Sequence, residues 1–143
     1  LHMRVKIIDK DNKNPKVYID GIKLRRNNRD ESSRVLFFSK DYVIKMEEAG
    51  SYLSQCSFEK RNWRKLEKKY AEFFVPTLKY GMQSGWEYVV QPRIRFKTTR
   101  VLEHEKLDFL VDILEKYDIC DCEDGYNIGV TKDNRILCYD YGV

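Results

Sequence analysis

One lysine interrupts the apolar run Tyr42-Val43-Ile44-Lys45-Met46. A charge is unusual in a strand that packs beneath a helix, although lysine readily extends its stem so that the ammonium reaches water. On the helix predicted to follow, Glu59 shares a face with apolar residues, where an ionised carboxylate is costly unless a cation or donors meet it. An ion pair between Lys45 and Glu59 would satisfy both groups and hold the ammonium rigidly in a cleft. The alternative for Glu59 is a place at the open end of the stripe, in contact with solvent.

An asparagine and an aspartate flank the last predicted hairpin. Asn127 precedes Ile128-Gly129-Val130, and Asp140 follows thirteen positions later in Asp140-Tyr141-Gly142. At the same ends of two paired strands, their side-chain oxygens can converge on one hard cation. Taken alone, each is better explained as a turn residue, because Asn and Asp favour turns.

The four cysteines, Cys56, Cys120, Cys122 and Cys138, offer a weaker case for a metal site. In a cytosolic protein we expect them to be reduced. The Cys120-x-Cys122 pair together with Cys138 lacks the two-residue spacer and the second paired motif that are typical of zinc sites. Zinc binding by these thiols is therefore a minor alternative.

The elements that must position these residues begin with strands. Lys16 to Leu24 is rich in branched and aromatic residues, with a turn or kink at Asp20-Gly21. Arg26 to Ser33 is polar and loop-like. Arg34 to Ser39 and Tyr42 to Met46 predict a hairpin around Lys40-Asp41, and Glu47 to Ser51 ends it.

A long helix is predicted from about Tyr52 to Phe74, closed by Pro76. One face of it carries residues at alternating steps of four and three. They are Tyr52, Cys56, Glu59, Trp63, Leu66, Tyr70 and Phe73. Asn62 is a mild blemish in this helix. Lys79 to Met82 and Trp86 to Gln91 predict two further strands.

Leu102 to Tyr117 is predicted as a second helix because its apolar residues recur at helical spacing. These residues are Leu107, Leu110, Val111, Leu114 and Tyr117. Tyr126 to Val130 and Arg135 to Tyr139 predict a last hairpin about Lys132-Asp133-Asn134. Strands, a long helix, two strands, a helix and a hairpin favour an α+β protein with an antiparallel sheet.

The bulk composition suits a single globular domain. The chain has 143 residues, 42% of them hydrophobic and 35% charged, which allows one domain, predicted over residues 3–143. Leu1 and His2 are interpreted as an expression scar. The apolar runs are too short to cross a membrane and no signal peptide is recognised, so we expect a cytoplasmic protein without a membrane partner.

Charge is distributed unevenly along the chain. Lys60 to Arg100 holds eleven Lys/Arg against three Asp/Glu, whereas Glu103 to Asp124 holds nine acids against two Lys. A solvated helix face is the simpler interpretation of the basic run, and a footprint for nucleic acid or an acidic protein is the alternative.

Together these residues resemble the protein-kinase-like superfamily. In that family a lysine of the third strand holds the nucleotide phosphates and pairs with a helix glutamate. Tyr42-Val43-Ile44-Lys45 resembles that strand, and Glu59 the glutamate. Trp86 to Gln91 with Pro92-Arg93 is similar to the fifth strand and the hinge against which adenine stacks.

The resemblance extends to the predicted last hairpin. Asn127 resembles the catalytic-loop asparagine, and Asp140 the metal aspartate of the Asp-Phe-Gly motif. It implies a kinase-like N-lobe, an antiparallel sheet plus one long helix, followed by a much reduced C-lobe of one helix and a β-hairpin. ATP and Mg²⁺ are the implied cofactors. Lys45, Glu59, Gln91 and Arg93 would bind the nucleotide, and Asn127 and Asp140 the metal.

The sequence departs from the family's pattern in three places. The loop Arg26 to Ser33 holds no glycine, so Arg25, Arg26 or Arg29 would have to contact phosphates instead. The catalytic base is replaced by Cys122, and Asp121 or Asp124 can substitute only in a reshaped loop. The sequence ends one residue after Gly142, without an activation segment or the helices on which kinases dock peptides.

Three functions follow as hypotheses. The first is a minimal kinase-like protein with a nucleotide and Mg²⁺ site, a pseudokinase or a weak ATP-dependent phosphotransferase, similar to compact members carried by bacteriophages. The second is a non-catalytic interaction protein that modulates a host protein through its basic helix face or its acidic segment. The third, ranked last, is nucleic-acid binding through Arg61, Arg64, Lys65 and Lys68 with Arg93, Arg95, Lys97 and Arg100.

Overall fold

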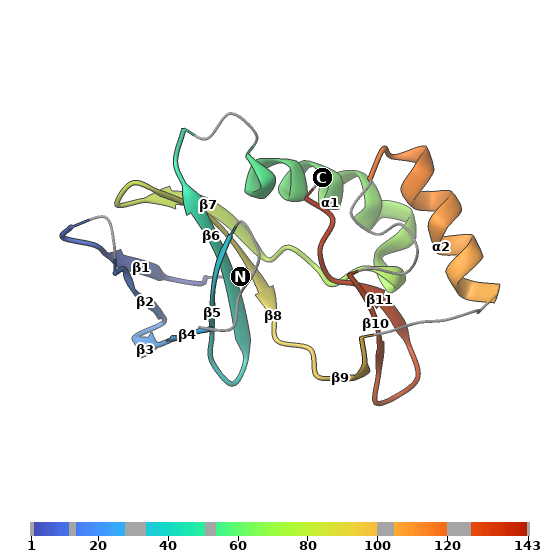
Figure 1. Ribbon diagram of the computed structural model, residues 1–143, viewed down its shortest axis with the longest axis horizontal. Helices are drawn as coiled ribbons and strands as arrows, with labels where there is room; N and C mark the ends of the chain where they lie inside the picture. The colour runs from blue at the N-terminus through green and yellow to red at the C-terminus, as the bar shows by residue number, and fades with distance from the viewer. Residues whose placement is uncertain are drawn as a thin grey trace. The chain divides into compact units, whose positions relative to one another are not determined.

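The chain forms two compact units in the computed structural model (Figure 1). The structure describes residues 2–11, 14–27, 34–50, 54–99, 105–119 and 127–142. The first unit comprises Leu1–Cys56 and Thr77–Arg93, and the second comprises Ser57–Pro76 and Ile94–Val143. Each unit contains antiparallel strands, and each has its own apolar core.

A five-stranded antiparallel sheet dominates the first unit, with the order β4-β5-β6-β8-β7. Its strands are β4 (Arg25–Arg26), β5 (Val35–Phe38), β6 (Tyr42–Glu48), β7 (Lys79–Gln83) and β8 (Trp86–Pro92). The predicted hairpin is confirmed, with Phe38 opposite Val43. The prediction that Glu47 ends this hairpin is wrong. Glu47 is a buried residue of β6, because β6 continues alongside β8, where Glu47 faces Glu87.

A smaller sheet precedes it in the chain and consists of β1 (Val5–Ile8), β2 (Lys16–Ile19) and β3 (Ile22–Lys23). The turn predicted at Asp20-Gly21 is confirmed: both residues have positive φ, 49° and 80°. Two such residues in a row match the twist of a tight hairpin, and glycine adopts this conformation without strain. Alternate residues of this sheet join the core of the first unit, together with residues of β5, β6 and β8.

Strand β1 was not predicted. It pairs only with β2 in its sheet, so its outer backbone groups need other partners. Side chains at the end of β7 supply them. Gln83 Nε2 donates to Val5 O at 3.1 Å, and Gln83 Oε1 accepts from Ile7 N. Ser84 Oγ donates to Ile7 O at 2.7 Å.

The predicted long helix is real but shorter. Helix α1 spans Gln55–Tyr70 and is followed by the 3-10 helix η1 (Ala71–Phe73); Tyr52 and Leu53 lie outside the described residues. Helix geometry stops at Phe74, which is extended at φ −132° and ψ 140°. There Val75 N donates to Cys138 O at 2.9 Å, and Pro76 disfavours a helical Val75.

The second unit also holds α2 (Glu105–Lys116) and a sheet of the order β11-β10-β9. Its strands are β9 (Phe96–Thr98), β10 (Ile128–Thr131) and β11 (Ile136–Cys138). The last hairpin is confirmed, with Ile128 opposite Cys138. Strand β9 was not predicted. The Phe96 ring lies against Gly129, where a Cβ atom would overlap it.

Both helices contribute to the core of the second unit. Its largest buried members are Leu66 of α1, Leu110 of α2, Phe74, Ile128 and Tyr141. Antiparallel sheets and two α-helices confirm the α+β class. Within the described part of the chain, no helix combines the length and apolar character that a membrane span requires.

Candidate functional site

Lys45 is buried on one face of β6. Side chains alternate between the two faces of a strand, and Ile44 and Met46 belong to the apolar core of the first unit. Lys45 therefore lies on the opposite face, with 6% of its surface exposed. The alternative in which the Lys45 side chain extends to place its ammonium in water is therefore wrong. A buried ammonium is tolerated only where acceptors or an anion compensate its charge.

Gln91 lies on the same face as Lys45. Val43 is opposite Gln91, and Lys45 is opposite Val89 in the pairing of β6 with β8. Residues directly opposite each other share a face of the sheet, so Lys45 and Gln91 are diagonal neighbours. Gln91 is also buried, with 3% of its surface exposed. Two of the predicted site residues are thus brought to one face.

Arg93 lies at one end of this face, where its guanidinium contacts the Phe38 ring. Phe38 pairs with Val43 and Arg25 and so shares their face. The Phe38 ring has the Arg93 guanidinium 4.7 Å from its centre and the Arg25 guanidinium 5.1 Å away. Arg93 Nη1 also donates to Ser39 O at 2.9 Å. Sequence reasoning missed Phe38, whose role depends on the register of the strands.

Two buried carboxylates lie at the other end of this face, where Glu47 is opposite Glu87. Glu47 Oε1 accepts hydrogen bonds from Cys56 N at 2.9 Å and from Ser54 Oγ at 3.3 Å. Ser54 also donates to Glu87 Oε1. The first N–H groups of a helix have no partner within the helix, and the first turn of α1 contains no acid. A strand carboxylate therefore caps α1 and holds its first turn to the sheet.

Glu59 is fully buried in α1, with no exposed surface. The alternative in which Glu59 reaches solvent at the open end of its stripe is therefore wrong. Its partners on the predicted stripe, Cys56 and Leu66, are equally buried. Glu59 belongs to the second unit and Lys45 to the first, so the ion pair between them stays a prediction.

Asn127 and Asp140 lie at the same end of the β10–β11 hairpin. Ile128 is opposite Cys138, and one residue further out Tyr139 N donates to Asn127 O at 2.9 Å. Asn127 has a φ of 59°, a conformation that asparagine tolerates better than most residues. Asn127 and Asp140 thus lie at the same ends of two paired strands, as the metal prediction requires. Metal binding itself stays a prediction.

Asp140 is followed by a firmly anchored residue, Tyr141, which has no exposed surface. Its hydroxyl donates to Val75 O at 2.6 Å, and its ring packs edge-on against Phe74 with centroids 5.4 Å apart. Asn62 Nδ2 donates to Tyr141 O at 2.7 Å. Asn62, an unfavourable residue in the helix pattern, thus makes a polar contact between α1 and the segment around Tyr141.

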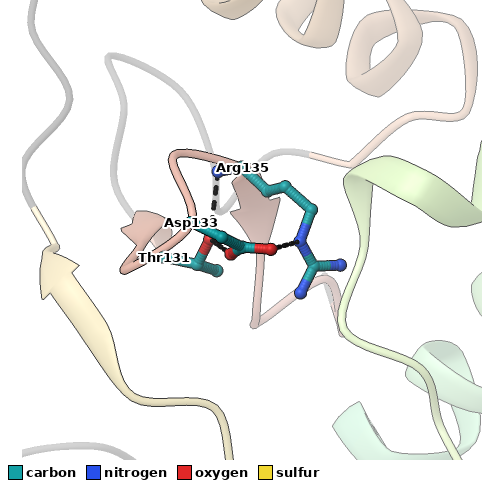
Figure 2. Close-up of polar contacts among 3 residues, drawn as sticks. All are labelled: Thr131, Asp133 and Arg135. Atoms are coloured by element: carbon teal, nitrogen blue, oxygen red, sulfur yellow. Dashed lines mark hydrogen bonds and ion pairs between the residues drawn. The ribbon is translucent and has the colours of Figure 1, made fainter.

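The opposite end of the hairpin is closed by Thr131, Asp133 and Arg135, as Figure 2 shows. The Thr131 hydroxyl donates to Asp133 Oδ1, Arg135 Nε donates to Asp133 Oδ2 at 2.9 Å, and Arg135 N donates to Thr131 Oγ1 at 3.0 Å. The hydrogen bond from Thr131 is the largest cause that lowers the pKa of the Asp133 carboxyl; the backbone N–H of Asp133 and the charge of Arg135 lower it further. The turn predicted at Lys132-Asp133-Asn134 is confirmed.

The candidate catalytic residues Asp121 and Asp124 lie outside the described residues, as do Cys120 and Cys122. Cys138 is buried, and its thiol lies 3.6 Å from Asp140 O. Within the described ranges, His, Cys, Asp and Glu side chains form no group of three that could hold a metal ion. The basic residues of α1, Arg61, Arg64, Lys65 and Lys68, are all exposed.

Solved structures of similar fold include kinases. The chain matches WbdD, in a co-crystal structure with the kinase inhibitor LY294002, over 82% of its own length, with a TM-score of 0.50 and 22% identity. A structure of the bifunctional kinase-methyltransferase WbdD matches 99% of the chain, with a TM-score of 0.50 and 17% identity.

The chain spans 32% and 41% of the length of these two WbdD chains. No protein-family model and no curated protein sequence matches it. At such low identity the similarity shows the fold alone. The chain has a kinase-like fold over most of its length, as the resemblance implied; the roles of Lys45, Glu59, Asn127 and Asp140 stay predictions.

Proposed function

We propose that the chain is a minimal kinase-like protein that binds a nucleotide on the Lys45 face of its five-stranded sheet. The observation that carries this proposal is the burial of Lys45 on the same face as Gln91 and Arg93. A buried ammonium is rare without a function or a fixed partner. In this proposal Lys45 binds a phosphate group of the nucleotide, which is the role of the third-strand lysine in the kinase family.

Phosphate oxygens would pair with Lys45, and the Arg25 and Arg93 guanidiniums would add positive charge on that face. Both guanidiniums are ordered over the Phe38 ring. Guanidinium groups match phosphate geometry through paired N–H donors. This supports the expectation that arginines take over the role of a glycine-rich loop, since the sequence 26–33 holds no glycine.

We further propose that Asn127 and Asp140 hold Mg²⁺. Carboxylate and amide oxygens are the protein ligands that suit this ion. The anchoring of Tyr141 by Asn62 and Val75 fixes the backbone next to Asp140, and a fixed ligand loses less entropy on binding. Bound Mg²⁺ would neutralise part of the negative charge of the phosphates. In this proposal the first unit corresponds to a kinase N-lobe and the second to a reduced C-lobe.

Catalysis by this chain is expected to be slow or absent. Phosphoryl transfer depends mainly on positioning and charge stabilisation, so nucleotide binding can persist where transfer is impaired. The substitution of the base position by Cys122 removes a group worth about 10²- to 10⁴-fold in rate. A pseudokinase, or a weak ATP-dependent phosphotransferase, fits these residues best.

Thermal unfolding with and without Mg-ATP tests the proposal. At ten times the dissociation constant, a ligand specific for the folded state stabilises by about 1.4 kcal/mol, on the order of 3–6 °C for a chain of this size. Lys45→Ala is expected to remove the shift and Asp140→Asn to remove its dependence on Mg²⁺. Lys10→Ala, which removes an exposed charge from the same unit, is expected to keep both. An unmodified protein that shows no shift at millimolar Mg-ATP would overturn the proposal.

A second candidate is an interaction protein that keeps the scaffold without the ligand. The aromatic residue Phe109 favours this candidate, because 49% of its surface is exposed. Its ring also packs edge-on against Tyr70 and Phe73. Exposed aromatic groups are common at protein interfaces. Association with a host protein that Phe109→Ser abolishes and Lys45→Ala leaves intact would favour this candidate over nucleotide binding.

A further inference from the structure

The solvent face of the three-stranded sheet is basic around one aromatic ring. Lys6 of β1 and Lys23 of β3 are both directly opposite Tyr18 of β2. Cross-strand neighbours of this kind have Cβ atoms about 4.5–5.5 Å apart on one face. The two lysines are exposed and Tyr18 is half-buried. Lys16, also exposed, lies on this face two residues before Tyr18.

This face continues into a basic groove of about 490 Å³. Lys16, Lys23, Arg25 and Arg26 line the groove, and Leu24 and Phe37 are its buried apolar members. None of the described residues that line it is acidic. Lys6, Lys16, Lys23 and Arg26 make no ion pair with any carboxylate in the part of the chain that the structure describes. Their charge is therefore available to an external anion.

We propose that the Tyr18 face, defined as Lys6, Lys16, Tyr18 and Lys23 with the groove residue Arg26, binds single-stranded nucleic acid. Lysines and arginines spaced along a groove suit a chain of phosphates, and an aromatic ring among them suits a stacked base. A sheet face that carries both features is a recurrent platform for single strands. The proposal can be tested apart from nucleotide binding at Lys45, because its three lysines and Tyr18 belong to the three-stranded sheet, whereas Lys45 belongs to the five-stranded sheet.

The position of the exposed apolar residue of this sheet argues against a membrane as the partner. Ile22 is 62% exposed, and it is directly opposite Ile19, whose side chain is buried in the core. Ile22 therefore lies on the face opposite to Tyr18. Membrane-surface segments usually combine a basic face with apolar groups that enter the lipid from the same side. The Tyr18 face offers charge and an aromatic ring instead.

The test uses fluorescence anisotropy of a labelled oligothymidine of about 20 nucleotides, longer than the ~4–16 nucleotides that one such module covers. Binding is expected to weaken with salt, with a logarithmic slope of about −0.7 per neutralised phosphate. Lys16→Ala with Lys23→Ala should make this slope shallower by about 1.4. Tyr18→Leu should weaken binding by about 5-fold or more at an unchanged slope, and Tyr18→Phe should retain it.

The matched control is Lys40→Ala with Lys132→Ala, which removes the same charge from two exposed turns outside this face. This variant is expected to bind like the unmodified protein. Equal losses in the two double variants would overturn the proposal, because binding would then follow net charge. Absence of oligonucleotide binding at low salt, or binding to phosphatidylserine vesicles alone, would overturn it as well. Circular dichroism of each variant checks that the fold is intact.

Discussion

At the scale of single residues, the first unit concentrates buried polar groups on one face of one sheet. Lys45, Glu47, Glu87 and Gln91 are all less than 10% exposed there, whereas the other face carries the apolar core. Burying ionised groups costs several kcal/mol each unless they are compensated. Glu47 and Glu87 are compensated in part by the helix start and by Ser54. Lys45 lies on this same face, and the functional proposal assigns it a nucleotide phosphate as ligand.

Asn62 is expected to stabilise the fold through its hydrogen bond to the Tyr141 carbonyl. Asn62→Ala leaves the buried Tyr141 carbonyl without its 2.7 Å donor, which typically costs about 1–3 kcal/mol. The better helix propensity of Ala offsets about 0.5 kcal/mol of that. Urea denaturation measures the difference. Glu67→Ala, on the exposed face of the same helix, serves as the control, and equal midpoints for the two variants would contradict this role.

Tyr88 is expected to make the protein sensitive to alkali. Burial raises the pKa of the Tyr88 hydroxyl above the usual 10.0. Because the unfolded chain loses this proton more readily than the folded chain, the contribution is complete below about pH 10 and declines as the pH rises further. Tyr88→Phe should therefore lose less stability than the unmodified protein between about pH 9 and 11. Chemical denaturation at about pH 9 and about pH 11 measures these stabilities. An equal loss of stability in the two proteins would contradict this assignment.

Part of the site was predictable from residue types alone. Lys45 and Glu59 stand out because each is a charge in an apolar pattern, and both are buried. Phe38, Glu47 and Asn62 could not be found in this way. Their roles depend on strand register or on a partner far along the chain, such as Tyr141 for Asn62. A hydrophobic pattern contains no information about such long-range polar contacts.

At the scale of elements, strong periodicity and turn chemistry identified the hairpins and helices. Short strands escaped for a physical reason. β1 has four residues and β9 has three, and both lie at a sheet edge, where contacts far along the chain stabilise them. Side chains of Gln83 and Ser84 stabilise β1, and a ring packed on a glycine stabilises β9. The helix predicted over 52–74 was too long at its C-terminal end, because Phe74 forms a β-bridge with Cys138 instead of another helical turn.

Gly129 is expected to be indispensable for the sheet of the second unit. A Cβ atom on Gly129 would overlap the Phe96 ring, so Gly129→Ala must displace β9 or the ring. Overpacking of this kind costs about 1–3 kcal/mol. Thermal unfolding compares it with Thr99→Ala, an exposed site nearby whose effect should stay within about 0.5 kcal/mol. An unchanged melting temperature for Gly129→Ala would show that Phe96 does not pack there.

At the scale of the whole molecule, a kinase-like fold is carried by a chain of 143 residues. Two units, each with its own core, divide the proposed tasks: the first offers Lys45 and the arginines around Phe38, and the second offers Asn127 and Asp140. The order of elements was sufficient to predict the α+β class, whereas the kinase-like fold was inferred from particular residues such as Lys45 and Glu59. Whether the ligand is retained is a question of chemistry at specific side chains and not of topology.

The most direct test of nucleotide retention is isothermal titration calorimetry with Mg-ATP on the full chain. The account predicts saturable binding of one nucleotide per chain, with a dissociation constant below about 1 mM, which corresponds to about −4 kcal/mol. Lys45→Ala should abolish the binding heat, and Lys10→Ala should leave it unchanged. Binding that persists in Lys45→Ala, or its absence in the unmodified protein, would contradict the central claim.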